Sequence, residues 1–451
     1  MRYTPLRTRP WVVGSLLLAG ACGDAAGPGL PTLAIVTDSL PRGLPDVAYA
    51  ETLEATGADQ SYTWSLAPGS GPLPVGLTLS TAGAVAGSPT LPGAFQFTVR
   101  VASGDGQSAE RPLSITVPPV LEPHESCGDY PAHAIATFED PALEFAVRQR
   151  LSDEQADLTC ATVATVTAVS LGLYAQVMGV ASLVGAQNLT GLTSLSFGES
   201  SSISDLGPIS GLTGLERIGL TGNDIVDLGP ISGLTNLTRL NLRDNMISDV
   251  SALAGLVNLE FLWLGRGAYS YVQKFGIPEV RGDPIMDISA LSGLTSLEEL
   301  WIPGQAIANL DALSGMTSLQ ELNAYANAIS DMSGVAGHPS LQNLILDSNA
   351  ITDLSPLAGL GTLANVLLRD NAITDVSGVE SLTGLREIRL DANVALSDIH
   401  PLLDNPGFGG PYPPPPAYDG HDLAGLTSTS VSCEDVALLE ARDILVSSDC
   451  P

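Results

Sequence analysis

The stretch LTNLTRLNLRDNMISDVSALAG, residues 234–255, has leucine, isoleucine or valine at fixed intervals. The same arrangement recurs along the chain, and most copies are spaced 22 residues apart. A repeat this short cannot bury its apolar side chains alone, so stacked copies must share one continuous core. Nine copies begin at Leu189, Leu212, Leu234, Leu256, Leu294, Met316, His338, Leu360 and Leu382, and a degenerate tenth copy precedes them.

Each copy is expected to contribute one short strand and a return leg. Six apolar residues of the quoted copy then point inward: Leu237, Leu240, Leu242, Ile247, Val250 and Leu253. The pattern L-x-x-L-x-x-L-x-L-x-x-N-x-I-x-D-x-x-x-L closely resembles the 22-residue leucine-rich repeat of bacterial internalins, over about residues 165–405. The resemblance implies an α/β-type solenoid, with parallel strands on the concave face and short 3-10 or turn segments on the convex face.

Two polar residue types recur at fixed places in the copies. The asparagine after the strand is expected to hydrogen-bond backbone groups of adjacent turns, which would otherwise be buried without partners. A column of aspartates could suggest cation binding, but its sequence context resembles a helix start and favours capping of a short turn. The columns are Asn223, Asn245, Asn327, Asn349, Asn371 and Asn393, and Asp205, Asp227, Asp249, Asp287, Asp331, Asp353, Asp375 and Asp398.

The repeat spacing is broken once, between Leu256 and Leu294, by an insertion at residues 268–283. A tolerated surface insertion is the ordinary explanation. Alternatively the insertion, which is basic and aromatic in an acidic chain, forms a lip beside a binding face, and its deletion should then weaken partner capture without unfolding the array. Its candidate binding residues are Tyr269, Tyr271, Phe275 and the only lysine of the chain, Lys274.

Alternate strand residues are expected to point out of the concave face in columns. Four large aromatic side chains then gather in the middle of the array: Phe261, Trp263, Trp301 and Tyr325. Exposed aromatic residues grouped on one face are typical of binding hot spots, although scattered exposed apolar residues are normal. We interpret these four residues as a partner-binding site.

The N-terminus has the features of an export signal. Three arginines precede an apolar run at 11–21 that is too short to span a bilayer. The run ends LLLAGAC, which resembles the bacterial lipobox and implies lipidation of Cys22, although Ala19 stands where leucine is commoner. An ordinary signal peptide cut near the same place is the alternative. We predict a lipoprotein signal peptide at 1–21 and a tether at 22–31.

Short alternating apolar stretches separated by Gly and Pro predict an all-β sandwich at residues 32–118. The run LPVGLTLSTAGAVAGSPTLPGAFQFTVRVASGDGQ (73–107) resembles the putative-Ig, cadherin-like domains of bacterial surface proteins. Some members of that group bind calcium between domains, so the resemblance implies calcium as an alternative here. No aspartate cluster is visible and Asp105 stands alone, so we otherwise expect no cofactor and no bound metal.

Helical segments are expected to close the ends of the array, because terminal repeats would otherwise expose the core. Asp140 and Pro141 can begin the first helix, and a capping box at 432–435 can begin the second. PPPP at 413–416 is interpreted as a rigid loop, with a polyproline ligand as the alternative. The predicted segments are a linker at 119–134, a helical N-terminal cap at 135–166, about ten repeats at 167–404 and a C-terminal cap at 405–451.

Four cysteines remain once Cys22 is assigned to lipidation. An even number in an exported chain predicts two disulfides. Of the three pairings allowed, Cys127 with Cys160 and Cys433 with Cys450 is the local one, since each pair brackets a short segment at one end of the array. A zinc site is disfavoured, because there is no C-x-x-C and no histidine at ligand spacing.

The net charge and the absence of catalytic motifs disfavour two classes of function. A net charge of −31 argues against binding nucleic acid, and no metalloprotease, nucleophile-elbow, Walker or dinucleotide motif is present, so we do not expect an enzyme. We predict an exported, monomeric lipoprotein of the bacterial cell envelope, anchored in the membrane by its lipid, whose array binds a protein partner. The alternatives are a passive structural component, or a carbohydrate-binding protein that stacks sugars on Trp263 and Trp301.

Overall fold

The computed structural model describes residues 30–151, 157–171, 178–198, 200–265, 283–409 and 422–450. The chain divides into two units, residues 1–118 and 119–451, and each is described by itself. Several sequence predictions lie outside the described residues: the signal peptide, Cys22 and most of the tether, the insertion with Tyr269, Tyr271, Lys274 and Phe275, and the prolines at 413–416.

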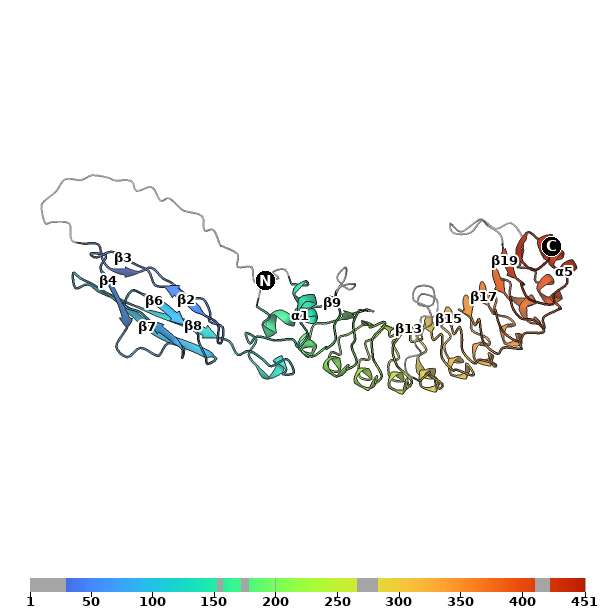
Figure 1. Ribbon diagram of the computed structural model, residues 1–451, viewed down its shortest axis with the longest axis horizontal. Coiled ribbons are helices and arrows are strands. Elements are labelled where there is room, and N and C mark those ends of the chain that lie inside the picture. Colours follow the sequence, from blue (N-terminus) through green and yellow to red (C-terminus); the bar gives the residue numbers. More distant parts are fainter. Residues whose placement is uncertain are drawn as a thin grey trace, which may run out of the picture. The chain divides into compact units, whose positions relative to one another are not determined.

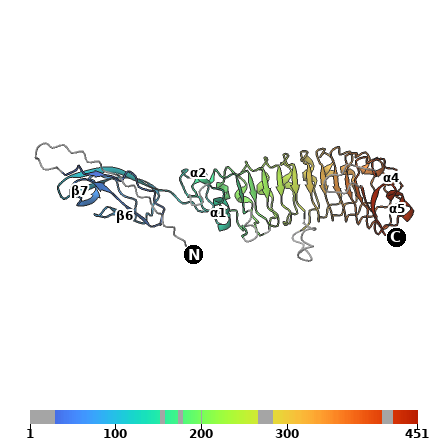
Figure 2. The same ribbon diagram turned by 90° about the horizontal axis from the view of Figure 1, so that it is seen from above.

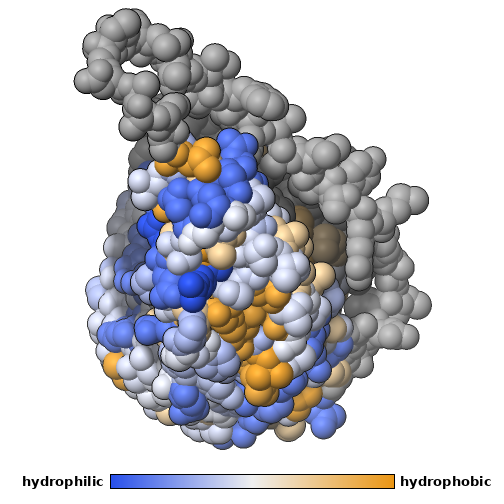
Figure 3. Space-filling model, turned by 90° about the vertical axis from the view of Figure 1, so that its left-hand side faces the viewer, coloured by the Kyte–Doolittle hydropathy of each residue, from blue (hydrophilic) through white to orange (hydrophobic). Residues whose placement is uncertain are grey.

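The first unit is made of antiparallel strands, as the alternating apolar pattern predicts. Apolar residues that alternate along its strands, among them Trp64, Val99 and Ile115, fill its core. Figure 3 shows one face of the molecule, on which apolar areas are bordered by polar ones. One sheet has the order β4 (Tyr62–Leu66), β7 (Gly93–Ser103), β8 (Ser108–Val117), the second β2 (Tyr49–Thr52), β6 (Ala84–Gly87), β5 (Leu77–Leu79), and β1 (Ala34–Ile35) pairs with β3 (Ala55–Thr56).

The second unit contains one parallel sheet of twelve strands in chain order. The strands line the concave side of this unit and the turns its convex side (Figure 1), and the strands lie side by side like rungs when seen from above (Figure 2). They are β9 (Ala168–Ser170), β10 (Ser194–Ser196), β11 (Arg217–Gly219), β12 (Arg239–Asn241), β13 (Phe261–Trp263), β14 (Glu299–Trp301), β15 (Glu321–Asn323), β16 (Asn343–Ile345), β17 (Asn365–Leu367), β18 (Glu387–Arg389), β19 (Asp422–Gly425) and β20 (Ile444–Ser447).

The return legs carry short helical turns and complete a shared core. All six residues predicted to point inward in the copy at 234–255 are at most 6% exposed, which confirms the α/β-type solenoid. The 3-10 turns are η1 (Cys127–Asp129), η3 (Ala186–Asn188), η4 (Gly207–Ile209), η5 (Gly229–Ile231), η6 (Ser251–Leu253), η7 (Ser289–Gly293), η8 (Asp311–Leu313), η9 (Ser333–Val335), η10 (Ser355–Leu357) and η11 (Val379–Ser381). The α-helices are α1 (Pro141–Arg148), α2 (Cys160–Val163), α4 (His400–Leu403) and α5 (Cys433–Glu440).

The asparagine column joins each repeat to the one before it. The Oδ1 atom of Asn393 accepts from the N–H of Ile373 at 3.0 Å, and its Nδ2 atom donates to the carbonyls of Leu368 and Leu390. The other five asparagines repeat this arrangement, which confirms the predicted role. Next to the insertion Gln305 substitutes for asparagine, and its Oε1 atom accepts from the N–H of Ile285 at 2.7 Å.

The aspartate column caps the helical turns, as predicted, but each aspartate precedes the N-cap residue by one position. Each carboxylate accepts from the N–H two residues later, so Asp249 binds the N–H of Ser251, the first residue of η6, at 2.8 Å. The N-cap position proper is Val250. Asn309 takes this place before η8 and accepts from the N–H of Asp311, so the position requires a side-chain oxygen rather than a charge.

These capping bonds predict a pH dependence of stability. The hydrogen bond from the following backbone N–H lowers the pKa of Asp249, Asp287 and Asp331 below its ordinary value of 3.8. A carboxyl whose pKa is lower in the folded than in the unfolded state stabilises the fold. This contribution is complete at a pH above the unfolded pKa, and it is lost as the pH falls through the folded pKa. We expect the wild type to lose stability below about pH 4. The triple variant Asp249→Asn, Asp287→Asn, Asp331→Asn should show a flatter profile.

Thermal unfolding of the two proteins between about pH 5 and pH 2.5 measures this difference. The asparagines retain an oxygen acceptor for the N–H, as Asn309 does, so only the charge is removed. Parallel loss of stability by both proteins down to the lowest pH would contradict the role of these three carboxylates.

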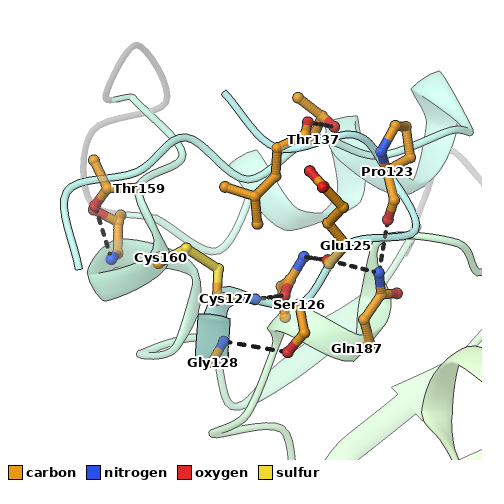
Figure 4. The surroundings of a disulfide bond; sticks show 12 residues. Pro123, Glu125, Ser126, Cys127, Gly128, Thr137, Thr159, Cys160 and Gln187 are labelled. Atoms are coloured by element: carbon orange, nitrogen blue, oxygen red, sulfur yellow. Dashed lines mark hydrogen bonds between the residues drawn. A yellow bond between two sulfur atoms is a disulfide. The ribbon is translucent and has the colours of Figure 1, made fainter. Parts of the chain in front are cut away.

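The N-terminal cap is more extensive than predicted. Helix α1 begins at Pro141 with Asp140 as N-cap, as the sequence predicts, and it buries Leu143, Ala146 and Val147. The stretch at 119–134, expected to be a linker, packs into the cap, where Leu121 is 1% exposed. It is fixed there by the Cys127–Cys160 disulfide and by hydrogen bonds from Gln187 to the carbonyls of Pro123 and Glu125 (Figure 4).

The C-terminal cap continues the sheet instead of only covering it. Helix α5 begins with the predicted capping box, in which Ser432 Oγ accepts from the N–H of Asp435 and donates to its carboxylate. Strands β19 and β20 add two further parallel rungs after β18, the last strand of the repeats. The second predicted disulfide, Cys433–Cys450, joins the start of α5 to the residues after β20.

Candidate functional site

Strand register brings the two predicted tryptophans together. Phe261 and Trp263 flank the buried Leu262 on β13, and Trp301 ends β14. The adjacent parallel strands pair Trp263 directly with Trp301, although the insertion separates them by 38 positions in the sequence. The two side chains therefore occupy neighbouring positions on the concave face.

The two indoles form a tilted pair that is held from one side by carboxylates. Their ring centroids are 5.3 Å apart and their planes differ by 30°. The Nε1 atom of Trp263 donates to Glu299 at 2.9 Å, and that of Trp301 donates to Glu321 at 2.8 Å. Both tryptophans are half-buried rather than exposed as the sequence suggests, because the indoles lean on each other and on these neighbours.

The other two predicted aromatic residues lie beside this pair. The guanidinium carbon of Arg239 lies over the ring of Phe261, 3.8 Å from the ring centroid. Tyr325 follows β15 in the next repeat, where its carbonyl accepts from the N–H of Gly304, in the turn after β14. Both side chains are half-buried. The four residues thus cover three successive repeats, and the two tryptophans among them form a ring pair.

Sequence reasoning missed the arginines that accompany the aromatic residues. The Arg243 guanidinium carbon lies 5.2 Å from the Trp263 ring centroid and 5.6 Å from that of Trp301, within the range of cation–π attraction. With Arg239 it makes a basic edge to the aromatic cluster. The signal was present, because both arginines fall in outward-facing columns one repeat before the aromatic residues.

The opposite edge of the cluster is acidic. Burial raises the pKa of the Glu299 carboxyl, and the nearby Glu321 carboxylate acts in the same direction. The indole N–H of Trp263 and the two arginines act against this shift. Phe261 and Trp263 on β13 therefore lie between Arg239 on β12 and the carboxylates of Glu299 and Glu321 on β14 and β15.

A close backbone contact marks the place where the insertion leaves the array. A Cβ atom at Gly265 would come 2.2 Å from Cδ of Pro303 and 2.4 Å from its backbone nitrogen. Only glycine allows the chain to pass so near to the following repeat. Gly265 is the last described residue before the insertion, so the strand carrying Phe261 and Trp263 stays in register up to that point.

The described residues offer neither a metal-binding cluster nor a membrane-spanning helix. Within the described residues no three His, Cys, Asp or Glu side chains gather so that they could hold a metal ion. The carboxylate of Asp105, the residue considered for calcium, accepts from the N–H and the side-chain amide of Gln107. Among the helices of the described ranges, none is sufficiently long and apolar to cross a membrane.

Two family models match the chain. The model described as a putative Ig domain matches residues 31–118, all but the first described residue of the first unit. The model described as leucine-rich repeats in two copies matches residues 235–269, which include β12 and β13. A search of curated proteins finds no match.

The similar solved structures include internalins of the bacterium Listeria monocytogenes. An internalin (inlF) from Listeria monocytogenes is 26% identical, with 69% of this chain and 90% of that chain covered and a TM-score of 0.52. An internalin C2 (inlC2) from the same organism is 31% identical, with 56% of this chain and 93% of that chain covered and a TM-score of 0.42.

The parallel ladder with its asparagine column and 3-10 turns defines a leucine-rich-repeat protein preceded by an Ig-like domain. In its repeat pattern and its fold this chain is similar to the internalin inlF. Its two disulfides, together with this likeness, indicate an extracellular or surface protein. Such a scaffold is of the kind that serves in protein interaction or adhesion.

Proposed function

We propose that the protein is a non-enzymatic, lipid-anchored component of the bacterial cell envelope that binds a protein partner on the concave face of its repeat array. Cys22 carries the anchor, and the first unit is a spacer between the anchor and the array. The binding site is centred on Trp263 and Trp301, with Phe261 and Tyr325 beside them.

The tryptophan pair is the observation that carries this proposal. Two half-buried indoles, aligned by strand register and fixed through their N–H groups, give a large contact surface that loses little conformational freedom on binding. A passive array would not need large aromatic residues on its outward columns, because its stability comes from the inward ones. This favours a binding function over a purely structural one.

The same geometry favours a protein partner over a glycan. A sugar platform requires an open, flat ring face, whereas here the indoles lean on each other at 5.3 Å and a guanidinium lies over both. Clusters of tryptophan with arginine are instead typical of protein–protein hot spots. Carbohydrate binding is therefore the second candidate.

The variant Trp263→Ala, Trp301→Ala, Tyr325→Ala should lose partner capture. Each hot-spot residue contributes about 2 kcal/mol or more, so removal of three should weaken binding at least about a hundredfold. The measurement is capture of surface proteins and glycans by the immobilised chain, followed by biolayer interferometry with each identified partner. The matched control is Ile345→Ala, Leu367→Ala, two half-buried residues of the Trp263 column on later strands.

The control should bind like the wild type. Equal capture by the aromatic variant and the wild type would remove the concave face from the proposal. Capture of glycans only, lost in the aromatic variant, would establish the carbohydrate alternative.

The anchor is tested separately from binding. When the chain is expressed in bacteria supplied with labelled palmitate, the wild type should incorporate the label and partition into detergent, and Cys22→Ser should do neither. The physical reason is that thioether-linked and amide-linked acyl chains supply the apolar surface that holds the protein in the membrane. Label retained by Cys22→Ser would contradict the anchor without bearing on the concave face.

A further inference from the structure

We propose that the partner presents an acidic peptide segment, which lies over β11 to β13 with its carboxylates on Arg217, Arg239 and Arg243 and an adjacent apolar side chain on the tryptophan pair. This inference rests on the proposed function, and it adds the chemistry of the partner. The arginines of the concave face fall into two groups, which differ in whether a carboxylate of the chain binds them closely.

Arginines of the C-terminal half are neutralised within the protein. The Arg369 guanidinium binds the Asp347 carboxylate with two nitrogens, at 2.8 and 3.0 Å, and this carboxylate is 6% exposed. The Arg389 Nε atom binds Glu387 at 2.8 Å. Carboxylates of the chain itself therefore occupy these two arginines.

Arginines of the N-terminal half are stacked on rings or exposed, and no carboxylate binds them closely. Within the described residues the guanidinium groups of Arg239 and Arg243 make no hydrogen bond and no ion pair, and their only ring contacts are with the aromatic cluster. Arg217 is 54% exposed and lies 3.9 Å from its neighbour Glu216, too far for a hydrogen bond. Strand register places Arg217 directly beside Arg239.

One of these three guanidinium groups, that of Arg243, has a buried N–H without a hydrogen-bond acceptor in the described part of the chain. The Nε atom of Arg243 is buried and has no hydrogen-bond partner among the described residues. A buried N–H without an acceptor destabilises the unbound state, and it gains most from a ligand that supplies one. A carboxylate matches the fork formed by Nε and one terminal nitrogen of a guanidinium, because it can accept two parallel hydrogen bonds.

The two carboxylates that hold the indole N–H groups are already engaged in hydrogen bonds. Glu299 and Glu321 each have an oxygen held by an indole N–H, and Glu321 accepts from Asn343 with the other. Glu299 lies on β14 and Glu321 on β15, which are two and three strands away from β12. The three arginines thus form a local positive area on a chain whose net charge is −31.

This charge arrangement selects both the partner and its position. The acidic remainder of the surface repels an acidic segment, whereas the arginine area attracts it, so the segment is steered to one end of the cluster. An apolar residue next to the carboxylates then reaches the indoles. Protein segments combine carboxylates and apolar side chains within a few residues, which anionic polysaccharides do not, so a peptide is favoured.

Three fluorescein-labelled 12-residue peptides test the inference on the full chain. They share leucine and phenylalanine at the same positions and differ only in having Glu, Gln or Lys at the others. Fluorescence polarisation at low and at physiological salt should show binding of the Glu peptide at least about tenfold tighter than binding of the Gln peptide. Its affinity should fall with salt, and the Lys peptide should bind more weakly still.

Arg243→Gln should weaken binding of the Glu peptide about tenfold or more, whereas Arg369→Gln, on the same face but already paired with Asp347, should leave it unchanged. Hydrogen exchange of the repeats shows that each variant is folded. Equal binding of the three peptides, equal loss in both variants, or binding of polygalacturonate but not of the Glu peptide would overturn the inference. If the triple aromatic variant still loses its captured partner in that case, the proposed function stands and only the partner's chemistry is wrong.

Discussion

Asn393→Ala is expected to destabilise the repeat unit by about 3 kcal/mol, one of the two largest effects predicted for a single side chain. The side chain is fully buried, and its three hydrogen bonds go to backbone groups of its own and the preceding repeat. Alanine leaves the Ile373 N–H buried without an acceptor and removes two donors from the carbonyls of Leu368 and Leu390. An unpaired buried donor alone costs about 1–3 kcal/mol.

Hydrogen exchange of repeat peptides at increasing urea concentration gives this free energy locally. The control is Asn365→Ala on β17, whose amide makes a single bond to Asn343 at the half-buried concave surface and should change stability by less than about 1 kcal/mol. Equal effects in the two variants would show that the asparagine column contributes no more than a surface amide.

Asp140→Ala should destabilise the N-terminal cap by a similar amount, about 3 kcal/mol. One carboxylate oxygen accepts from the N–H of Ala142 in the first turn of α1, and the other accepts from the N–H groups of Ala181 and Ser182, in the degenerate first repeat. The side chain therefore fixes the helix to the array as well as capping it. Its loss leaves three N–H groups without this acceptor in a nearly buried place.

Exchange rates of the Ala181 and Ser182 amides report this effect directly. They should rise sharply in Asp140→Ala, while repeats far from the cap keep the wild-type rates. Glu139→Ala is the control, since its neighbouring carboxylate makes one exposed bond to the Ser182 hydroxyl. If amide exchange in Asp140→Ala rises only within α1, the role of Asp140 is limited to capping this helix.

The repeat pattern predicts most of the array because each apolar position has one role in every copy. Leu240 and its equivalents must be buried if the copies stack, and Asn245 and its equivalents must satisfy the backbone, so one copy predicts the others. The same regularity aligned Trp263 with Trp301 across the insertion. The binding role of these residues, and that of the insertion, stays a prediction.

What the sequence did not predict depends on contacts that occur only once. Leu121 and Gln187 belong to no periodic pattern, so the packing of 119–134 into the cap could not be inferred. Strands β19 and β20 have no repeat signature, yet β19 pairs with β18 and β20 pairs with β19. The stacking of Arg243 on the two indoles depends on side-chain conformations, which the repeat pattern does not specify.

The backbone on either side of the insertion bears on how this scaffold can be changed. The N–H of Leu264 still pairs with Trp301, and the N–H of Ile285 still pairs with Gln305, so the ladder is continuous across the break. The cost of closing a loop grows by only about 0.6 kcal/mol for each doubling of its length. Segments of other length and composition can therefore be grafted between Gly265 and Ile285, and a library built there would vary one segment on an otherwise constant framework.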